Sequence, residues 1–262
     1  MLDCEELNVR IDGKHLLNKI SWEVKPGKVN AIIGLNGAGK STLINAMAGQ
    51  CPVDGGCVRL NGQPLLRFSA CDRARQIALV TQHTDTPSAL SVQEVLALGC
   101  LPPLGSASLH LPAVRESVEQ ISESFALTAL LGRPMNRLSG GEQRRVLLAQ
   151  AWAQATPIIL LDEPTNHLDT AQQLALMDRL TDSDKTLVMA LHDVNLARLY
   201  SDFLLVLEHG SVLIAGPTAE VLNTQLLDRL YSRRFIGLDH RHLATQWFAP
   251  VTVAQGDDVT CA

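Results

Sequence analysis

Continuous apolar runs, rather than alternating ones, mark the strands that the sequence predicts. They occupy residues 29–33, 77–80, 158–161, 187–191 and 203–207. A strand that is apolar on both sides is buried on both faces, as in a parallel sheet covered by helices. Helical patterns over 170–180 and 193–200 lie between these runs. The pattern therefore predicts an α/β fold with a parallel sheet.

The strand signal disappears between about residues 91 and 152, where helical patterns dominate. Ser91 and Glu94 have the spacing of a capping box that opens one helix, and a second helix is expected over 112–125. The connection at 101–108 is rich in Pro, Gly and Ser, as an exposed loop is. We expect a helical subdomain over about 84–154, inserted in a single domain that spans 1–262 and ends in an extension over 235–262.

Composition and charge argue against several classes of function. The net charge is -5 and no basic tail is present, which argues against a nucleic-acid partner. The first six residues are acidic and lack the apolar stretch of a signal peptide, and no run approaches the ~20 apolar residues of a membrane span. The scattered cysteines lack the spacing of a zinc site. We expect a cytoplasmic chain that reaches a membrane only through a partner.

A phosphate-binding loop follows the apolar run at 29–33, with the pattern Gly34-x4-Gly39-Lys40-Ser41 ahead of a helix expected over 42–48. Its backbone N–H groups curl around phosphate, Lys40 reaches the β and γ phosphates, and the Ser41 hydroxyl can ligate Mg²⁺. A glycine-rich turn without a ligand would leave the position of the lysine unexplained. The loop therefore predicts a site for nucleotide phosphates together with Mg²⁺. The nucleotide-binding residues of this loop are expected to be Gly34, Asn36, Gly37, Ala38, Gly39, Lys40, Ser41 and Thr42.

Two carboxylates follow the apolar run at 158–161. In phosphate-loop folds a strand beside the loop strand delivers an acid to Mg²⁺, which suits Asp162, and Glu163 is then free to polarise a water. The alternative is that both acids only cap a turn before Pro164. A GTPase is not expected, because Asn166–Asp169 lacks the lysine of the guanine-reading Asn-Lys-x-Asp.

A second glycine-rich helix start lies at Leu138-Ser-Gly-Gly-Glu142. Ser139 and Glu142 alone would form an ordinary capping box. Gly140 and Gly141, however, each cost a helix roughly 1 kcal/mol relative to alanine and leave the first-turn N–H groups bare. The segment therefore predicts an anion site that has no lysine of its own, which suits a phosphate already bound elsewhere.

With this segment the chain resembles the ATP-binding subunits of ABC transporters over essentially its whole length. Leu138–Glu142 is similar to the family's signature Leu-Ser-Gly-Gly-Gln, with Glu142 where glutamine is commoner. The resemblance implies a P-loop NTPase of ABC type, which has a mostly parallel core sheet, an N-terminal antiparallel β part and an inserted helical subdomain. It also implies a head-to-tail dimer in which Ser139, Gly140 and Gly141 of one copy cover the γ-phosphate bound by the other. Glu142 is expected to belong to the same nucleotide-binding segment.

The resemblance also implies roles for single residues. Gln82 is similar to the glutamine that touches Mg²⁺ and the attacking water, His192 to the switch histidine, and Leu168-Asp169 to the loop that contacts the other subunit. Taken alone, Gln82 would be a polar loop residue and His192 a structural histidine at a strand end. The expected catalytic residues are Glu163, His192 and Gln82, and the expected Mg²⁺ ligands are Ser41, Gln82 and Asp162.

Three other classes fit the chain less well than a transport ATPase. ABC proteins that act on ribosomes or DNA generally carry two cassettes or a long coiled-coil insertion. Exporters usually fuse the cassette to membrane spans. A P-loop kinase would need an acceptor pocket and no second anion-binding helix. The interpretation is therefore the ATP-hydrolysing subunit of an ABC importer.

The expected partners are a second copy of the chain, integral membrane permease subunits and, indirectly, a periplasmic or surface substrate-binding protein. The chain would then lie at the cytoplasmic face of the inner membrane. Leu98–Pro102 and His192–Ala197 resemble segments of the subunits for iron chelates, heme and cobalamin, although Cys100 replaces the usual arginine. We expect a ferric siderophore as cargo, then heme, then cobalamin. Ile11 stands where the family usually stacks adenine on an aromatic ring, so π-stacking would be lost.

Overall fold

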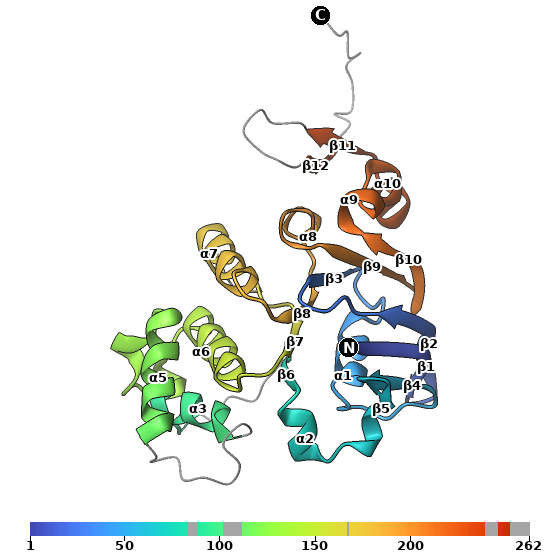
Figure 1. The fold of residues 1–262 in the computed structure, drawn as a ribbon. Helices are drawn as coiled ribbons and strands as arrows, with labels where there is room; N and C mark the ends of the chain where they lie inside the picture. The colour runs from blue at the N-terminus through green and yellow to red at the C-terminus, as the bar shows by residue number, and fades with distance from the viewer. Residues whose placement is uncertain (83–88, 102–111, 167, 239–245, 252–262) are drawn as a thin grey trace, which may run out of the picture.

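The computed structural model describes residues 1–82, 89–101, 112–166, 168–238 and 246–251. Figure 1 shows a small sheet on one side of a larger one and a group of helices on the other side. Among these residues no helix combines the length and the apolar character that crossing a membrane requires.

The larger sheet has six strands in the order β10-β9-β3-β8-β7-β6. Neighbouring strands are parallel, except that β10 is antiparallel to β9. Every residue of β3, β7 and β8 is buried, which explains why the sequence shows continuous apolar runs there. The strands are β3 (Val29–Ile33), β6 (Ile77–Val80), β7 (Ile158–Asp162), β8 (Thr186–Ala190), β9 (Phe203–Glu208) and β10 (Ser211–Pro217). The predicted α/β fold with a mostly parallel core sheet is confirmed.

The smaller sheet is antiparallel and comes mainly from the N-terminus. It contains β1 (Leu2–Ile11), β2 (Lys14–Glu23), β4 (Gly55–Leu60) and β5 (Gln63–Pro64) in the order β2-β1-β4-β5. Asp12 and Gly13 join β1 to β2, and both have positive φ (50° and 76°). A two-residue turn with positive φ at both positions matches the twist of a hairpin. The N-terminal antiparallel part that the family resemblance implied is thus present.

Helix α1 (Lys40–Met47) lies between the two sheets. Its Leu43 and Met47 are completely buried and share one apolar core with Leu7 of β1 and Leu160 of β7. Burial of each such side chain contributes roughly 1.5–3 kcal/mol. The helix begins two residues before the predicted start at 42, because its first turn continues directly from the phosphate loop. This packing fixes the start of α1 against the core sheet.

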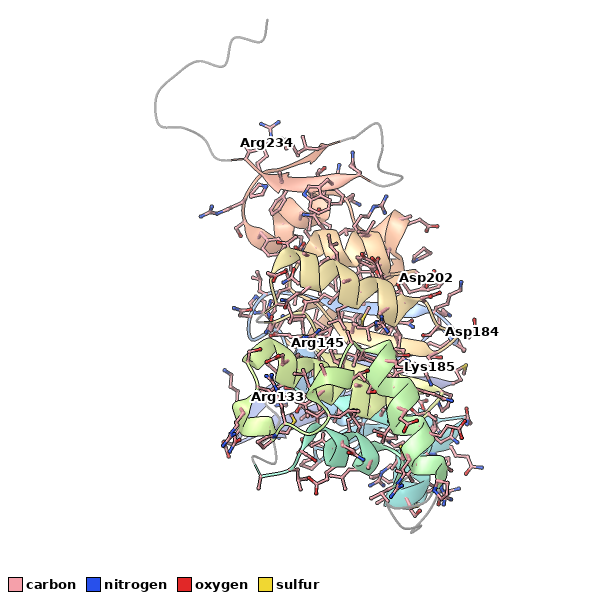
Figure 2. All side chains as sticks on the ribbon, turned by 90° about the vertical axis from the view of Figure 1, so that its left-hand side faces the viewer. Arg133, Arg145, Asp184, Lys185, Asp202 and Arg234 are labelled. Carbon is pink, nitrogen blue, oxygen red and sulfur yellow. The ribbon has the colours of Figure 1, made fainter. Side chains whose placement is uncertain are left out.

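The helices on the other face of the core sheet share a second apolar core. Figure 2 looks onto this face, with α7 above the helices of the inserted part. They are α3 (Val92–Gly99), α5 (Pro112–Ser124), α6 (Gly140–Ala153), α7 (Thr170–Thr181) and α8 (Val194–Tyr200), while α2 (Ala70–Ala74) is a short connecting helix. Helix α3 starts with the predicted capping box of Ser91 and Glu94. The predicted connection at 101–108 lies, apart from Leu101, outside the described residues.

A short hairpin follows helices α9 (Thr218–Val221) and α10 (Thr224–Tyr231). Its strands are β11 (Phe235–Leu238) and β12 (Trp247–Pro250), and Figure 1 shows them beyond α10. The side chain of Asn195 in α8 accepts a hydrogen bond from the Phe248 N–H (2.8 Å) and donates one to the Phe248 carbonyl (3.1 Å). Part of the predicted C-terminal extension is therefore an ordered hairpin fastened to α8.

Candidate functional site

Four parallel strands end at one edge of the core sheet, and the predicted site residues follow them. β3 leads into the phosphate loop, β6 is followed by Gln82, β7 ends in Asp162 with Glu163 next, and β8 is followed shortly by His192. Because β3, β8, β7 and β6 are consecutive neighbours, these residues meet at the carboxyl edge, where α/β folds bind ligands. A cavity of about 340 Å³ lies there. It is lined by Leu16, Asn36, Gly37, Gly39, Lys40, Ser41, Thr42, Gln82, Glu163 and His192.

The phosphate loop depends on glycine where it joins α1. Gly39 has a φ of 101°, a conformation that other residues rarely adopt. A Cβ atom there would lie 2.9 Å from the Leu16 carbonyl oxygen and 2.8 Å from a methyl group of Leu17. Only glycine lets the N-terminal sheet approach the loop so closely.

Lys40 is held inside the loop that it follows. Its side chain is almost fully buried, and its Nζ donates to the carbonyl oxygens of Gly34 (2.8 Å) and Leu35 (3.2 Å). Burial lowers the pKa of Lys40, and the nearby carboxylates of Glu163 and Asp162 oppose that shift. The lysine is therefore a buried cation whose carbonyl partners a phosphate oxygen can replace.

Asp162 has the features of a cation ligand. It is 2% exposed, and burial raises its pKa although a hydrogen bond with Ser41 acts in the opposite direction. Its Oδ1 is buried and has no hydrogen-bond partner among the described residues. A buried carboxylate oxygen without a partner is costly, and carboxylate and hydroxyl oxygens are the ligands that Mg²⁺ prefers. Ser41 and Asp162 therefore fit a Mg²⁺ ion.

Such an ion would need further ligands. Within the ranges that the structure describes, no group of three or more His, Cys, Asp or Glu side chains could hold a metal by itself. Mg²⁺ commonly binds one or two protein side chains together with nucleotide phosphates and water. Gln82 lines the same cavity and is exposed, so its amide oxygen is available to this region.

Glu163 is oriented by two neighbours. It is 6% exposed, with a positive φ of 51°. One carboxylate oxygen contacts His192 Nε2, and the other accepts a hydrogen bond from the Asn166 side chain. His192 itself is partly open to solvent, since 41% of its side chain is exposed. The carboxylate is thus fixed at the cavity with a histidine beside it.

Asn166 is a residue that the sequence argument missed, because it was considered only as part of a guanine-reading motif. Its backbone N–H donates to the Glu163 carbonyl at 3.3 Å, which closes a turn with Pro164 inside it. Proline at the second position of such a turn is a recognisable signal. This signal would have predicted a turn that brings Asn166 close to Glu163.

The signature segment lies apart from this cavity. Ser139 caps α6 and forms the capping box with Glu142, whose pKa is lowered by its hydrogen bonds to the Ser139 backbone and hydroxyl. None of Ser139, Gly140, Gly141 and Glu142 belongs to the cavity lining. A Cβ atom on Gly140 would meet nothing within 4 Å. Nothing in the described part of this chain therefore explains why that position is glycine.

The N-terminal sheet contributes one aliphatic residue to the cavity lining, and this residue is not Ile11. Ile11 is 44% exposed and does not line the cavity, whereas Leu16 does. An aliphatic residue, rather than an aromatic ring, thus faces the cavity from the N-terminal sheet. The expectation that Ile11 occupies the place of the adenine-stacking ring stays a prediction.

Comparison with known proteins places this site in a family. A family model described as ABC transporter matches residues 17–166, more than half of the chain. The chain is 38% identical over 245 residues to a hemin import ATP-binding protein of Nocardia farcinica, covering 91% of this chain and 83% of the relative. It is 32% identical over 234 residues to an iron(3+)-hydroxamate import ATP-binding protein of Bacillus subtilis, covering 88% and 87%. The chain therefore belongs to the ABC transporter family. Within that family it is an ATP-binding subunit, an ABC-type ATPase coupled to transport.

A solved structure supports the same fold. The protein cbiO1 of Clostridium perfringens, part of the ABC transporter complex cbiONQ, matches with a TM-score of 0.73 at 29% identity, covering 87% of this chain and 92% of that one. The predicted ABC-type fold and the resemblance to ATP-binding subunits are confirmed. The resemblance to the group that serves iron chelates and heme is confirmed as well, because the two relatives above carry such names.

Proposed function

We propose that this ATPase hydrolyses Mg²⁺-ATP in the cavity at the strand ends and thereby drives the import of an iron complex. One observation carries the proposal: a single cavity joins the buried Lys40 of a phosphate loop to Glu163, which is oriented by His192. ATP hydrolysis uses positive charge around the phosphates and a group that positions water, and Lys40 and Glu163 would supply these two parts. The names of the relatives supply the direction and the class of cargo.

The phosphate loop would bind the nucleotide through its backbone and through Lys40. The N–H groups at the start of α1 and the positive end of the helix favour anionic oxygens. Lys40 would exchange its bonds to the Gly34 and Leu35 carbonyls for phosphate oxygens. A bound Mg²⁺, with Ser41, Asp162 and Gln82 as protein ligands, would neutralise phosphate charge.

Glu163 would accept the proton of the attacking water. Each carboxylate oxygen keeps a free lone pair beside its contact with His192 or Asn166, so it can also accept a hydrogen bond from water. His192 would then contact the γ-phosphate from the neighbouring strand end. Together Glu163 and His192 would orient water for in-line attack. Such positioning would be their main contribution to the rate of hydrolysis.

The signature segment would act on the nucleotide of a second copy. Its four residues lie outside the cavity of their own chain, and Gly140 faces open space. Two chains arranged head to tail would place Ser139, Gly140 and Gly141 on the γ-phosphate bound by the partner. The first turn of α6 is exposed at Ser139 and Gly140 and has the positive end of the helix dipole, which supports this arrangement although the capping box occupies one of its N–H groups.

The proposed cargo is heme first and a ferric siderophore second, the reverse of the order expected from short motifs. Identity to hemin import relatives reaches 36–38%, against 31–32% for relatives that serve iron(3+)-hydroxamate and enterobactin. The chain would work at the cytoplasmic face of the membrane, docked on permease subunits that receive cargo from an external binding protein. The membrane partners, rather than the ATPase, would contact the iron complex.

A deletion strain tests the cargo. Uptake of radiolabelled iron would be measured with hemin and with ferric hydroxamates as sole iron sources, after complementation by the wild-type chain or by Glu163→Gln. We expect the deletion to abolish hemin uptake, with rescue by the wild-type chain only. Loss of hydroxamate uptake alone would reassign the cargo to siderophores, and normal uptake of both would refute the iron proposal.

A further inference from the structure

Arg144 reaches from the signature helix into the core beside the catalytic strand ends. It is five residues beyond the cap of α6 and only 8% exposed. Its Nη1 donates to the Thr81 carbonyl (2.6 Å), and its Nη2 donates to the carbonyls of Asp162 (2.5 Å) and Glu163 (3.0 Å). One side chain thus bonds the residue that follows β6, the last residue of β7 and the residue after it. Figure 2 shows the neighbouring Arg145 on the outer helical face, so the two arginines differ in role.

The carbonyl oxygens that Arg144 contacts belong to residues that form the candidate site or directly precede one of its members. Thr81 immediately precedes Gln82, and Asp162 and Glu163 carry the two carboxylates. Glu163 has a φ of 51°, which costs a residue other than glycine about 1–3 kcal/mol and persists only where its surroundings enforce it. Its N–H donates to Ala190, and its carbonyl accepts from Arg144 and from Asn166. Arg144 is therefore one of the groups that enforce this conformation.

The burial of Arg144 needs an explanation beyond packing. Desolvation lowers the pKa of its guanidinium, opposed by the charges of Asp162 and Glu163, and its buried Nε has no partner in the described part of the chain. An apolar side chain could fill the same space without that cost. What an apolar side chain lacks is a planar fork that donates to several carbonyls at fixed angles.

We propose that Arg144 is a positioning residue for hydrolysis, which ties the signature helix to the backbone that aims Glu163. The inference rests on the proposed function, because it takes Glu163 as the group that activates water. A shift of α6, when its first turn meets a nucleotide on another copy, would then move the Glu163 backbone through these hydrogen bonds. The rate of turnover should depend on Arg144, whereas nucleotide affinity should not.

Two substitutions and a control measure this dependence. Arg144→Met should lower kcat about 100-fold, since small misplacements of catalytic groups have effects of that size. Arg144→Lys, which offers a charge but not the planar fork, should lower it about tenfold. The KM for ATP should change less than about twofold in both, because the phosphate loop is intact. Arg59→Gln, which removes an arginine from an exposed pair with Glu5, should leave kcat unchanged.

A double-mutant cycle separates positioning from general damage. If Arg144 acts through Glu163, Arg144→Met should lower the residual single-turnover rate of Glu163→Gln by less than about threefold. Equal loss in both backgrounds would overturn the inference, as would an unchanged kcat in Arg144→Met. Should the methionine variant fail to fold by thermal melting, the same cycle with Arg144→Lys decides. Wild-type turnover in Glu163→Gln would instead refute the proposed function, and the inference with it.

Discussion

The two glycine-rich helix starts of this chain differ in what surrounds them. At Gly39 the chain itself fills the space, because the Leu16 carbonyl leaves no room for a Cβ atom and Lys40 bonds the loop carbonyls. A Cβ atom added at Gly140 would have no neighbouring atom within 4 Å. In the proposed head-to-tail dimer, the first anion site would be completed within one chain, whereas the second would act on the phosphate of the partner. Glycine thus has a steric cause at Gly39, and the proposal gives it a functional one at Gly140.

The largest effect on hydrolysis is expected in the cavity that the phosphate loop lines. Glu163→Gln should retain ATP binding but lower hydrolysis about 10³-fold, because water loses its proton acceptor while the phosphate contacts remain. The variant should accumulate as an ATP-bound dimer in size-exclusion chromatography with ATP and Mg²⁺. Glu208→Gln removes a carboxylate at another strand end and serves as the control. A monomeric Glu163→Gln that hydrolyses ATP normally would contradict the assignment.

Mixing two inactive chains tests whether the second start acts on a partner. Lys40→Ala should lose ATP affinity, whereas Ser139→Arg should bind ATP normally and lose hydrolysis. An equal mixture should recover activity above either chain alone, because each heterodimer combines the intact Lys40 loop of one chain with the intact Ser139 of the other. If both single variants lose ATP affinity equally and the mixture stays inactive, the two glycine-rich helix starts bind the nucleotide of the same chain.

Alanine at the two glycines should have opposite effects on stability. Gly39→Ala should lower the free energy of unfolding by about 1–3 kcal/mol, since its φ is strained for alanine. Gly140→Ala should leave stability unchanged or raise it by up to about 1 kcal/mol, yet reduce turnover by blocking close approach of a phosphate. Urea denaturation and ATPase assays measure both. Destabilisation by Gly140→Ala would show that packing within the chain requires this glycine after all.

The smallest effect concerns pH. Burial raises the pKa of Asp162 above its ordinary 3.8, so between these two values the folded chain binds more protons than the unfolded chain, and stability falls as pH rises. Asp162→Asn should therefore raise Tm at neutral pH without nucleotide, by about 3 °C, and the difference should vanish below pH 3.8. With Mg²⁺-ATP the wild-type chain should be the more stable one. A lower Tm for the variant without nucleotide would contradict the burial penalty, and an equal gain in Tm from Mg²⁺-ATP in both chains would contradict the cation-ligand assignment.

The sequence predicts best what depends on short, strong signals. The strands at Val29–Ile33 and Ile77–Val80 match their apolar runs, because strands buried on both faces tolerate few polar residues. The hairpin of β11 and β12 escaped prediction, since its four-residue strands are half exposed and its order comes from Asn195, far away in sequence. Arg144 looks like any surface residue of a helix, and only the packing of α6 against two strand ends gives it a role.

The carbonyl partners of Lys40 bear on how quickly the cycle can repeat. Because the lysine bonds Gly34 and Leu35 in its own chain, the loop has its shape before any phosphate arrives. In the proposed binding mode, arrival of the nucleotide would exchange one set of hydrogen bonds for another, without the entropy loss of ordering a flexible segment. The same exchange would run backwards when products leave, so the loop would need no refolding step between turnovers. The association and dissociation of the two chains would then limit the rate of the cycle.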